Sequence, residues 1–287
     1  MTLFIALIVF VLERFFSPLA HWRAEQRCRR GLARLNDRLS QTLPAPVAAA
    51  LIVFGLPLLL GLLLYSFPAQ GFGLILMGTV SLGLLLLLVA PQQAERRSSE
   101  LAQACLNADE SAADACSIEL GLPRARTNDQ QLAERIIVLG FAEWFAVLFW
   151  FAVGGIVVAL LYRLIEWQAS NDHPAAAPYR WFKGLFDWLP ARLYAALLLL
   201  AGGFNRGLDA WLDPAVPEQP LPAANAALIG RVGHAALELT RADDCGDTPS
   251  CLIDQARWVK AASAIVLRVV ILGLGLIALF TLNGWLR

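Results

Sequence analysis

Charged residues are scarce in this sequence, and lysine and histidine are scarcer still. Of 287 residues, 16% are charged and 58% are hydrophobic, whereas about a quarter of the residues of an ordinary soluble domain are charged. A soluble fold of this length would lack the polar residues to cover its surface. The formal net charge is zero, so we expect no nucleic-acid partner, because phosphate binding needs a concentrated basic surface.

Several familiar sites are also missing from the sequence. The two lysines, Lys183 and Lys260, follow no glycine-rich turn of the kind that binds nucleotide phosphates. The three histidines, His21, His173 and His234, are too scattered to indicate a metal site or a catalytic dyad. The first residues show no basic region and no small-residue cleavage site, so we expect no cleaved signal peptide. We therefore expect no resident metal or cofactor, and no residue stands out as a catalyst.

Long hydrophobic runs dominate what is present, and they predict an all-α integral membrane protein with about five to six membrane helices. The candidate spans are residues 2–19, 46–67, 71–90, 136–164, 189–204 and 261–286. The first run is short, so it crosses fully only if Glu13 and Arg14 lie at the interface. The alternative is a re-entrant or interfacial helix. We expect one membrane domain over residues 1–287.

Three polar stretches separate these runs. Residues 14–43 are rich in arginine and have leucines at helical spacing, which fits an amphipathic helix on a lipid surface or a solvated basic linker. Residues 91–135 and 205–260 are expected to form short helices that pack together on one side of the membrane. Membrane lipids are the expected surroundings of the rest of the chain.

The sidedness of these stretches rests on two signals that disagree. If all six runs cross, the three stretches share one side and carry most of the 23 lysines and arginines, which places them in the cytoplasm. Two cysteine pairs in these stretches favour disulfides and the periplasm instead: Cys105 with Cys116, and Cys245 with Cys251. A four-cysteine zinc site is less well supported, because neither pair has CxxC spacing. The prediction is cytoplasmic, with disulfides as the alternative.

Two membrane segments carry ionisable residues. Glu143 lies in the run 136–164, where it faces a polar cavity or partner, or else meets water near the interface. Pro190 is expected near the start of the next helix, which puts Arg192 on its first turns. There Arg192 reaches lipid headgroups, or pairs with Asp187 or Glu143.

Short motifs in a fixed order give a more specific indication. The chain opens with IVFVLERFFSPLAHW, which contains Glu13, Arg14, His21 and Trp22. The later motifs are Arg126-Thr127, Ala142-Glu143, Leu148-Phe149-Trp150, Gly154-Gly155, Tyr162-Arg163 and Pro190-Ala191-Arg192-Leu193 after Asp187. In these motifs the chain resembles the AmpE family of bacterial inner-membrane proteins, which is related to the cobinamide-phosphate synthase family (CbiB/CobD).

The chain also departs from the cobalamin enzymes. Trp144 stands where they have asparagine, Ala146-Val147 replaces an Asp-Gly pair, and residues 205–260 contain no counterpart of their late NAGxPE segment. The resemblance therefore implies that the scaffold is kept and amide synthesis is lost.

By resemblance, the chain would be a non-catalytic regulator of β-lactamase induction and β-lactam resistance. It would respond to cell-wall status and act beside proteins of cell-wall recycling or β-lactamase regulation. The alternatives are a residual amide ligase that uses a nucleotide, and a scaffold or transport component. The candidate functional residues are Glu13, Arg14, His21, Arg126, Thr127, Glu143, Asp187 and Arg192.

Overall fold

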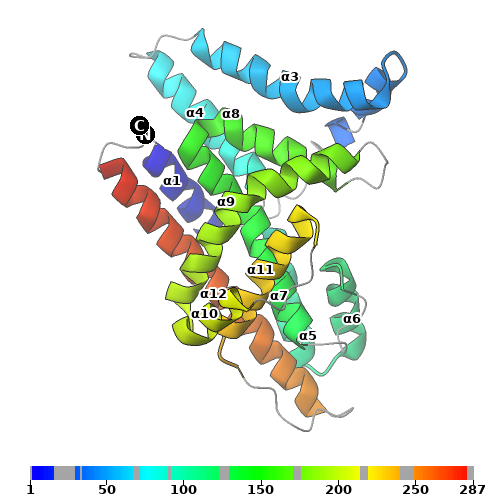
Figure 1. Cartoon of the computed structure of the whole chain (residues 1–287), viewed down its shortest axis with the longest axis vertical. Helices are drawn as coiled ribbons and strands as arrows, with labels where there is room; N and C mark the ends of the chain where they lie inside the picture. Colours follow the sequence, from blue (N-terminus) through cyan, green and yellow to red (C-terminus); the bar gives the residue numbers. More distant parts are fainter. Residues whose placement is uncertain are drawn as a thin grey trace. The chain divides into compact units, whose positions relative to one another are not determined.

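The computed structural model describes residues 2–15, 30–32, 34–66, 72–89, 92–122, 129–170, 176–213, 219–239 and 249–282. These residues form helices and contain no strand, which confirms the all-α prediction (Figure 1). The elements are α1 (Thr2–Phe15), α3 (Ala45–Tyr65), α4 (Phe72–Leu88), α5 (Gln92–Leu106), α6 (Glu110–Glu119), α7 (Asp129–Gly140), the π-helical turn η1 (Phe141–Phe145), α8 (Ala146–Ala169), α9 (Ala177–Ala201), α10 (Phe204–Leu212), α11 (Leu221–Ala236) and α12 (Pro249–Leu282).

Four helical stretches are long and apolar enough to cross a membrane: Pro46–Tyr65, Gln130–Ala169, Ala177–Ala201 and Leu252–Leu282. Two other predicted spans are shorter as helices. Helix α1 has 14 residues and α4 has 17, although residues 16–19 of the first span lie outside the described part. Within the described residues, the 17-residue α4 is short for a bilayer of about 30 Å.

The chain divides into two compact units. Unit 1 comprises Met1–Ala90, Ala146–Asp187 and Leu274–Arg287, and unit 2 comprises Pro91–Phe145 and Trp188–Gly273. The single membrane domain expected over residues 1–287 stays a prediction.

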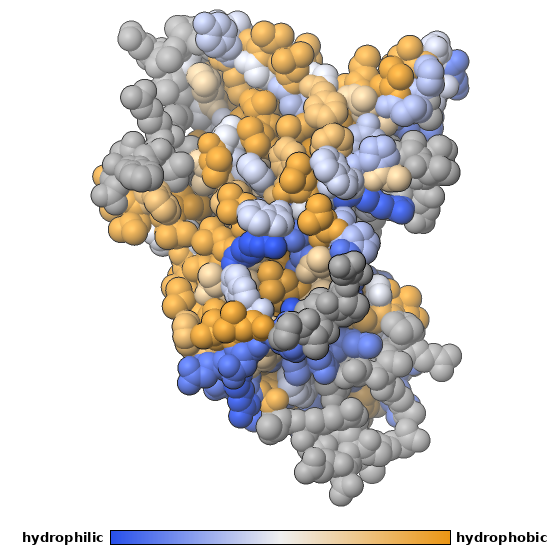
Figure 2. Space-filling model, viewed as in Figure 1, coloured by the Kyte–Doolittle hydropathy of each residue, from blue (hydrophilic) through white to orange (hydrophobic). Residues whose placement is uncertain are grey.

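In unit 1, α3 packs along α8, and α1 and α4 also pack on α8. One face of α3 buries Ala49 and Val53 against Leu164, Ile165 and Tyr179. The other face leaves large side chains exposed; Leu58 and Leu59 are each 66% exposed. Hydrophobic side chains predominate over α3 in Figure 2, as expected where lipid replaces water.

In unit 2, the two polar stretches pack together as short helices, as predicted. Helix α11 packs between α10 and α7, and α5 packs on α6 and α7. The Cys105 thiol of α5 donates to Oε1 of Gln255 on α12 at 3.5 Å. The side of the membrane that this unit faces stays a prediction.

The fourth predicted span departs from a simple helix at two places. Residues 141–145 form a π-helical turn, and Gly155 interrupts α8 with φ 69° and ψ −167°. A side chain is strained at positive φ, whereas glycine adopts it freely. The helical stretch is therefore broken at Gly155, within the run predicted as the span 136–164.

The fifth predicted span, 189–204, overlaps the later part of a longer helix, and the expectation that a helix starts near Pro190 is wrong. Helix α9 begins at Ala177, contains Pro190 in its interior and ends at Ala201. Upstream of the proline, Tyr179, Phe182 and Phe186 pack into the core of unit 1, and this burial outweighs the lost backbone hydrogen bond. The α10 helix then starts at Phe204 after two glycines.

Candidate functional site: a buried charged cluster

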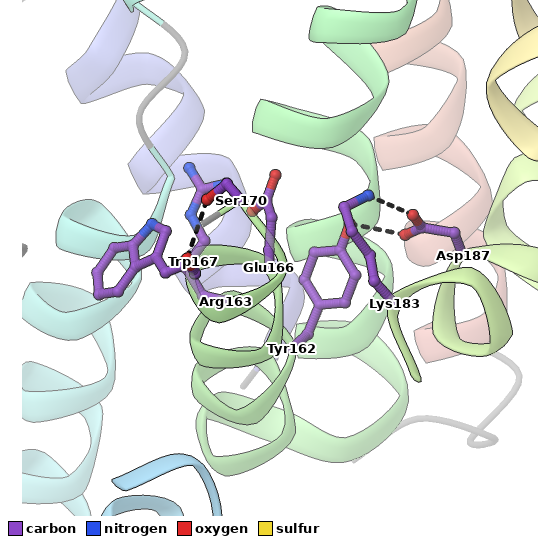
Figure 3. A network of polar contacts seen from close by, with 7 residues as sticks. All are labelled: Tyr162, Arg163, Glu166, Trp167, Ser170, Lys183 and Asp187. Atoms are coloured by element: carbon purple, nitrogen blue, oxygen red, sulfur yellow. Dashed lines mark hydrogen bonds and ion pairs between the residues drawn. The ribbon is translucent and has the colours of Figure 1, made fainter. Parts of the chain in front are cut away.

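Unit 1 contains a group of charged and polar side chains buried between α8 and the first turns of α9 (Figure 3). Its members are Tyr162, Arg163, Glu166, Lys183 and Asp187, and we call them the buried charged cluster. Tyr162 is fully buried, and Arg163 and Asp187 are 2% and 3% exposed. Both helices are candidate spans, where a charge is costly unless it is paired.

Asp187 is the centre of one half of this cluster. Its Oδ1 accepts a 2.8 Å hydrogen bond from the Tyr162 hydroxyl, and its Oδ2 accepts from the ammonium of Lys183. Lys183 and Asp187 are four residues apart, which places them on the same face of α9. Tyr162 comes from α8, so this carboxylate joins the two helices.

The other half is an ion pair within α8. Arg163 donates from a guanidinium nitrogen to Glu166, three residues later. At the end of α8, the Ser170 hydroxyl donates to the carbonyl of Trp167 at 2.9 Å (Figure 3). At the next turn, Arg180 Nε donates to the Ala169 carbonyl at 3.2 Å, so the end of α8 is tied to the start of α9.

The chemistry of the cluster follows from its balance of charge. Two cations and two anions form two ion pairs, and the tyrosine hydroxyl is engaged with one of the anions. Within the described part of the chain, no three His, Cys, Asp or Glu side chains are grouped to hold a metal ion.

Aromatic residues of α3, α8 and α9 pack on one another in unit 1. Trp150 packs on Phe186 with ring centroids 5.0 Å apart, and Phe54 of α3 meets Phe182 edge-on at 6.5 Å. These contacts place apolar rings on the two helices that carry the buried charged cluster. The low polarity around the ion pairs strengthens them and raises the cost of breaking them.

Arg192 is placed differently from the prediction that pairs it with an acid. Its guanidinium lies 4.1 Å from the Trp188 ring centroid and donates to the Trp188 carbonyl at 2.9 Å. Asp187 instead bonds to Tyr162 and Lys183. The predicted pairing of Arg192 with Asp187 is therefore not seen among the described residues.

Glu143 lies in the π-helical turn of unit 2 and is partly exposed. Beside this turn, Tyr194 packs against Phe141 and Phe145, and its hydroxyl donates to the Ile137 carbonyl at 3.3 Å. A π-helical turn is frequently found at functional sites, so Glu143 stays a candidate.

The other candidates fall outside the described residues. His21, Arg126 and Thr127 lie there entirely, and the side chains of Glu13 and Arg14 do too, although their backbone is helical. Their functional roles stay predictions.

The cysteines are described for one predicted pair. Cys105 is buried and hydrogen-bonded to Gln255, Cys116 is partly buried, and both are thiols. Cys245 lies outside the described residues, as does the side chain of Cys251, so a disulfide between them stays a prediction.

Sequence reasoning named Asp187 as a candidate but missed its partners. The available signal was spacing: Lys183 and Asp187 are four apart, and Arg163 and Glu166 are three apart. Opposite charges at these intervals lie on one helix face. Tyr162-Arg163 was noted only as a family motif.

Comparisons with known proteins fit this membrane architecture. A family model described as "Regulatory signalling modulator protein AmpE" matches residues 1–284. The chain is 27% identical to the Protein AmpE of Shigella flexneri over 228 residues, which cover 74% of this chain and 78% of that protein. No solved structure matches the chain.

A second relative comes from cobalamin metabolism. The chain is 30% identical to the Cobalamin biosynthesis protein CobD of Chromobacterium violaceum over 165 residues, which is 48% of this chain. The matched part covers 53% of that relative, about half its length.

Proposed function

The chain belongs to the AmpE family of regulatory signalling modulators, and from this membership we propose that it modulates β-lactamase induction at the bacterial inner membrane. Its signal would be the status of the cell wall, and its partners would be proteins of cell-wall recycling or β-lactamase regulation. The observation that carries the proposal is the match of the family model over residues 1–284. A multi-pass location is supported by the four long apolar helices.

The buried charged cluster supports a regulatory role without catalysis. Its carboxylate, ammonium and hydroxyl groups are bonded to one another. A general base or nucleophile would need to be held ready for a substrate. A buried hydrogen bond that joins two helices, as Tyr162 of α8 and Asp187 of α9 form, suits a conformational element whose two states a signal can bias.

Deletion of the gene tests this function. β-Lactamase activity is measured with and without a β-lactam inducer in the parent, the deletion strain and the deletion strain carrying the wild-type gene. We expect altered induction in the deletion strain, restored by the wild-type gene, with cobalamin synthesis unchanged. Equal induction in all three strains would remove the proposal.

An amide ligase that uses a nucleotide is the second candidate, favoured by the similarity to the CobD relative. The test is nucleotide hydrolysis by purified protein, compared with Asp187→Asn and with Asp209→Asn, an exposed aspartate on α10. Hydrolysis that is lost in the first variant and kept in the second would establish this activity. Absence of hydrolysis in the wild-type protein would leave the regulatory role alone.

A further inference from the structure

Three arginines line a helical segment just before α3. Residues 30–32 and 34–40 are helical, and Arg30, Arg34 and Arg38 on this segment are exposed. Arg34 and Arg38 are four residues apart within residues 34–40, so they share one helix face, and Arg30 lies four residues before Arg34 in the sequence. We call these three residues the basic boundary surface.

Another side of the same segment is anchored in the protein. Leu32 packs against the core of unit 1 that contains Ala49 and Val53 of α3. Leu39 is partly buried, whereas Leu35 is 40% exposed. The segment is therefore amphipathic and packs on the rest of unit 1. A solvated linker would not bury these leucines.

This seat lies at the ends of membrane segments. Helix α3 begins at Ala45, and with a rise of about 1.5 Å per residue Ala49 is about 6 Å along it. The same core includes Ala169, the last residue of α8, and Tyr179, two residues after α9 begins. Trp167 and Phe182 pack against it, and aromatic rings concentrate at the membrane interface. The segment thus packs where α3 and α9 begin and α8 ends, which is where a bilayer crossed by these helices would have its headgroups.

The charge around the seat is positive. Asp37 is the acid within the segment, against three arginines. On the neighbouring helices, Glu166 is paired with Arg163, and Arg180 at the start of α9 is a further exposed cation. Phosphate groups are matched by guanidinium groups in charge and in hydrogen-bond geometry.

We propose that the basic boundary surface binds the headgroups of anionic phospholipids. Arg34 and Arg38 donate hydrogen bonds to the lipid phosphates while Leu32 holds the helix against unit 1. The surface leads directly into a candidate span, so bilayer headgroups are the anions in reach. This recognition does not depend on the regulatory role.

Spin-label spectroscopy on the full chain reconstituted in phosphatidylcholine vesicles tests the proposal. The preference of the protein for spin-labelled phosphatidylglycerol over spin-labelled phosphatidylcholine is measured for wild type, Arg34→Gln/Arg38→Gln and Arg34→Lys/Arg38→Lys. The control is Arg96→Gln/Arg97→Gln, which removes two arginines that are already paired with Glu100 and Glu119.

We expect the wild-type protein to prefer phosphatidylglycerol and the glutamine pair to lower that preference by up to about fivefold per arginine. The lysine pair, which keeps the charge, should retain most of it, and the control should change little. An unchanged preference in Arg34→Gln/Arg38→Gln, or an equal loss in the control or the lysine pair, would overturn the proposal. So would a loss caused by inorganic phosphate and not by sodium chloride of equal ionic strength, because the surface would then bind free phosphate.

Discussion

The Tyr162 hydroxyl donates a 2.8 Å hydrogen bond to Oδ1 of Asp187, while Oδ2 of the same carboxylate receives the Lys183 ammonium. The three groups come from two helices that the chain connects within unit 1. Since both carboxylate oxygens are used, the position of α8 against the start of α9 is fixed by polar contacts as well as by packing. Disturbing one member should therefore affect the others.

Removal of Lys183 alone should be worse than removal of the whole ion pair. Lys183→Met leaves a buried carboxylate without its cation, at a cost of about 3 kcal/mol in the free energy of unfolding. The double variant Lys183→Met/Asp187→Leu removes both charges and should be closer to wild type. Reversible unfolding in mixed micelles measures the difference.

The exposed pair of Arg96 and Glu100 provides the control for this cycle. Arg96→Met should change the free energy of unfolding by less than about 1 kcal/mol, because water screens exposed pairs. A Lys183→Met variant as stable as Arg96→Met would contradict the burial of the charged cluster.

Tyr162→Phe isolates the hydrogen bond to Asp187. The ring and its packing are kept, so the expected loss is only about 0.6–1.5 kcal/mol. The loss should vanish when Asp187 is already leucine, because the acceptor is gone. A loss of equal size in both backgrounds would show that the hydroxyl contributes through another partner.

Gly202 allows a close approach of backbone in unit 2. A Cβ atom there would lie 2.4 Å from the Ala236 carbonyl oxygen and 2.9 Å from Ile265 Cδ1. Gly202→Ala should cost about 1–3 kcal/mol, because backbone must shift. Gly83 in α4 has nothing within 4 Å of such an atom, so Gly83→Ala should be neutral or stabilising by about 0.5–1 kcal/mol.

Cys116 reports on the local charge around α6. Burial raises the pKa of its thiol, and the carboxylates of Glu100 and Glu119 raise the pKa further. Since the thiolate is the reactive form, labelling near neutral pH should be slow. Glu100→Gln/Glu119→Gln should lower the pKa and speed labelling by maleimide. An unchanged pH profile of the labelling rate would contradict the effect of these two acids.

The same thiol tests the predicted sidedness. In a variant with Cys28, Cys245 and Cys251 changed to serine, a membrane-impermeant maleimide should label Cys116 only after the cells are opened. Cys105 is buried and should stay unlabelled in both cases. Labelling of Cys116 in intact cells would place residues 91–135 outside the cytoplasm.

Hydrophobic runs predicted the helix bounds well where apolar, lipid-facing composition alone determines them. Helices α3 and α4 begin and end within two residues of the spans predicted at 46–67 and 71–90. Helix α9 begins 12 residues before the span predicted at 189–204; that prediction uses Pro190, because a proline is expected near the start of a helix. That inference ignored packing of Tyr179 and Phe182, which stabilises the preceding turns.

The site was harder to predict than the helices. A sequence gives spacing along one helix, so the ion pair of Lys183 and Asp187 could have been found. The contact of Asp187 with Tyr162 depends on how α8 meets α9, which the spacing along one helix does not give. In a membrane helix, a Gly154-Gly155 pair more often indicates close packing between helices. The sequence therefore contains no distinct signal for the break in α8 at Gly155.

The most direct test of the account is induced β-lactamase activity in the deletion strain carrying wild type, Asp187→Asn or Asp209→Asn, each at equal membrane levels. Wild type and Asp209→Asn should restore the parental induction, because Asp209 is exposed on α10 and lies outside the buried charged cluster. Asp187→Asn should fail to restore it. If the deletion strain and all three complemented strains show the same induction, the regulatory function is contradicted.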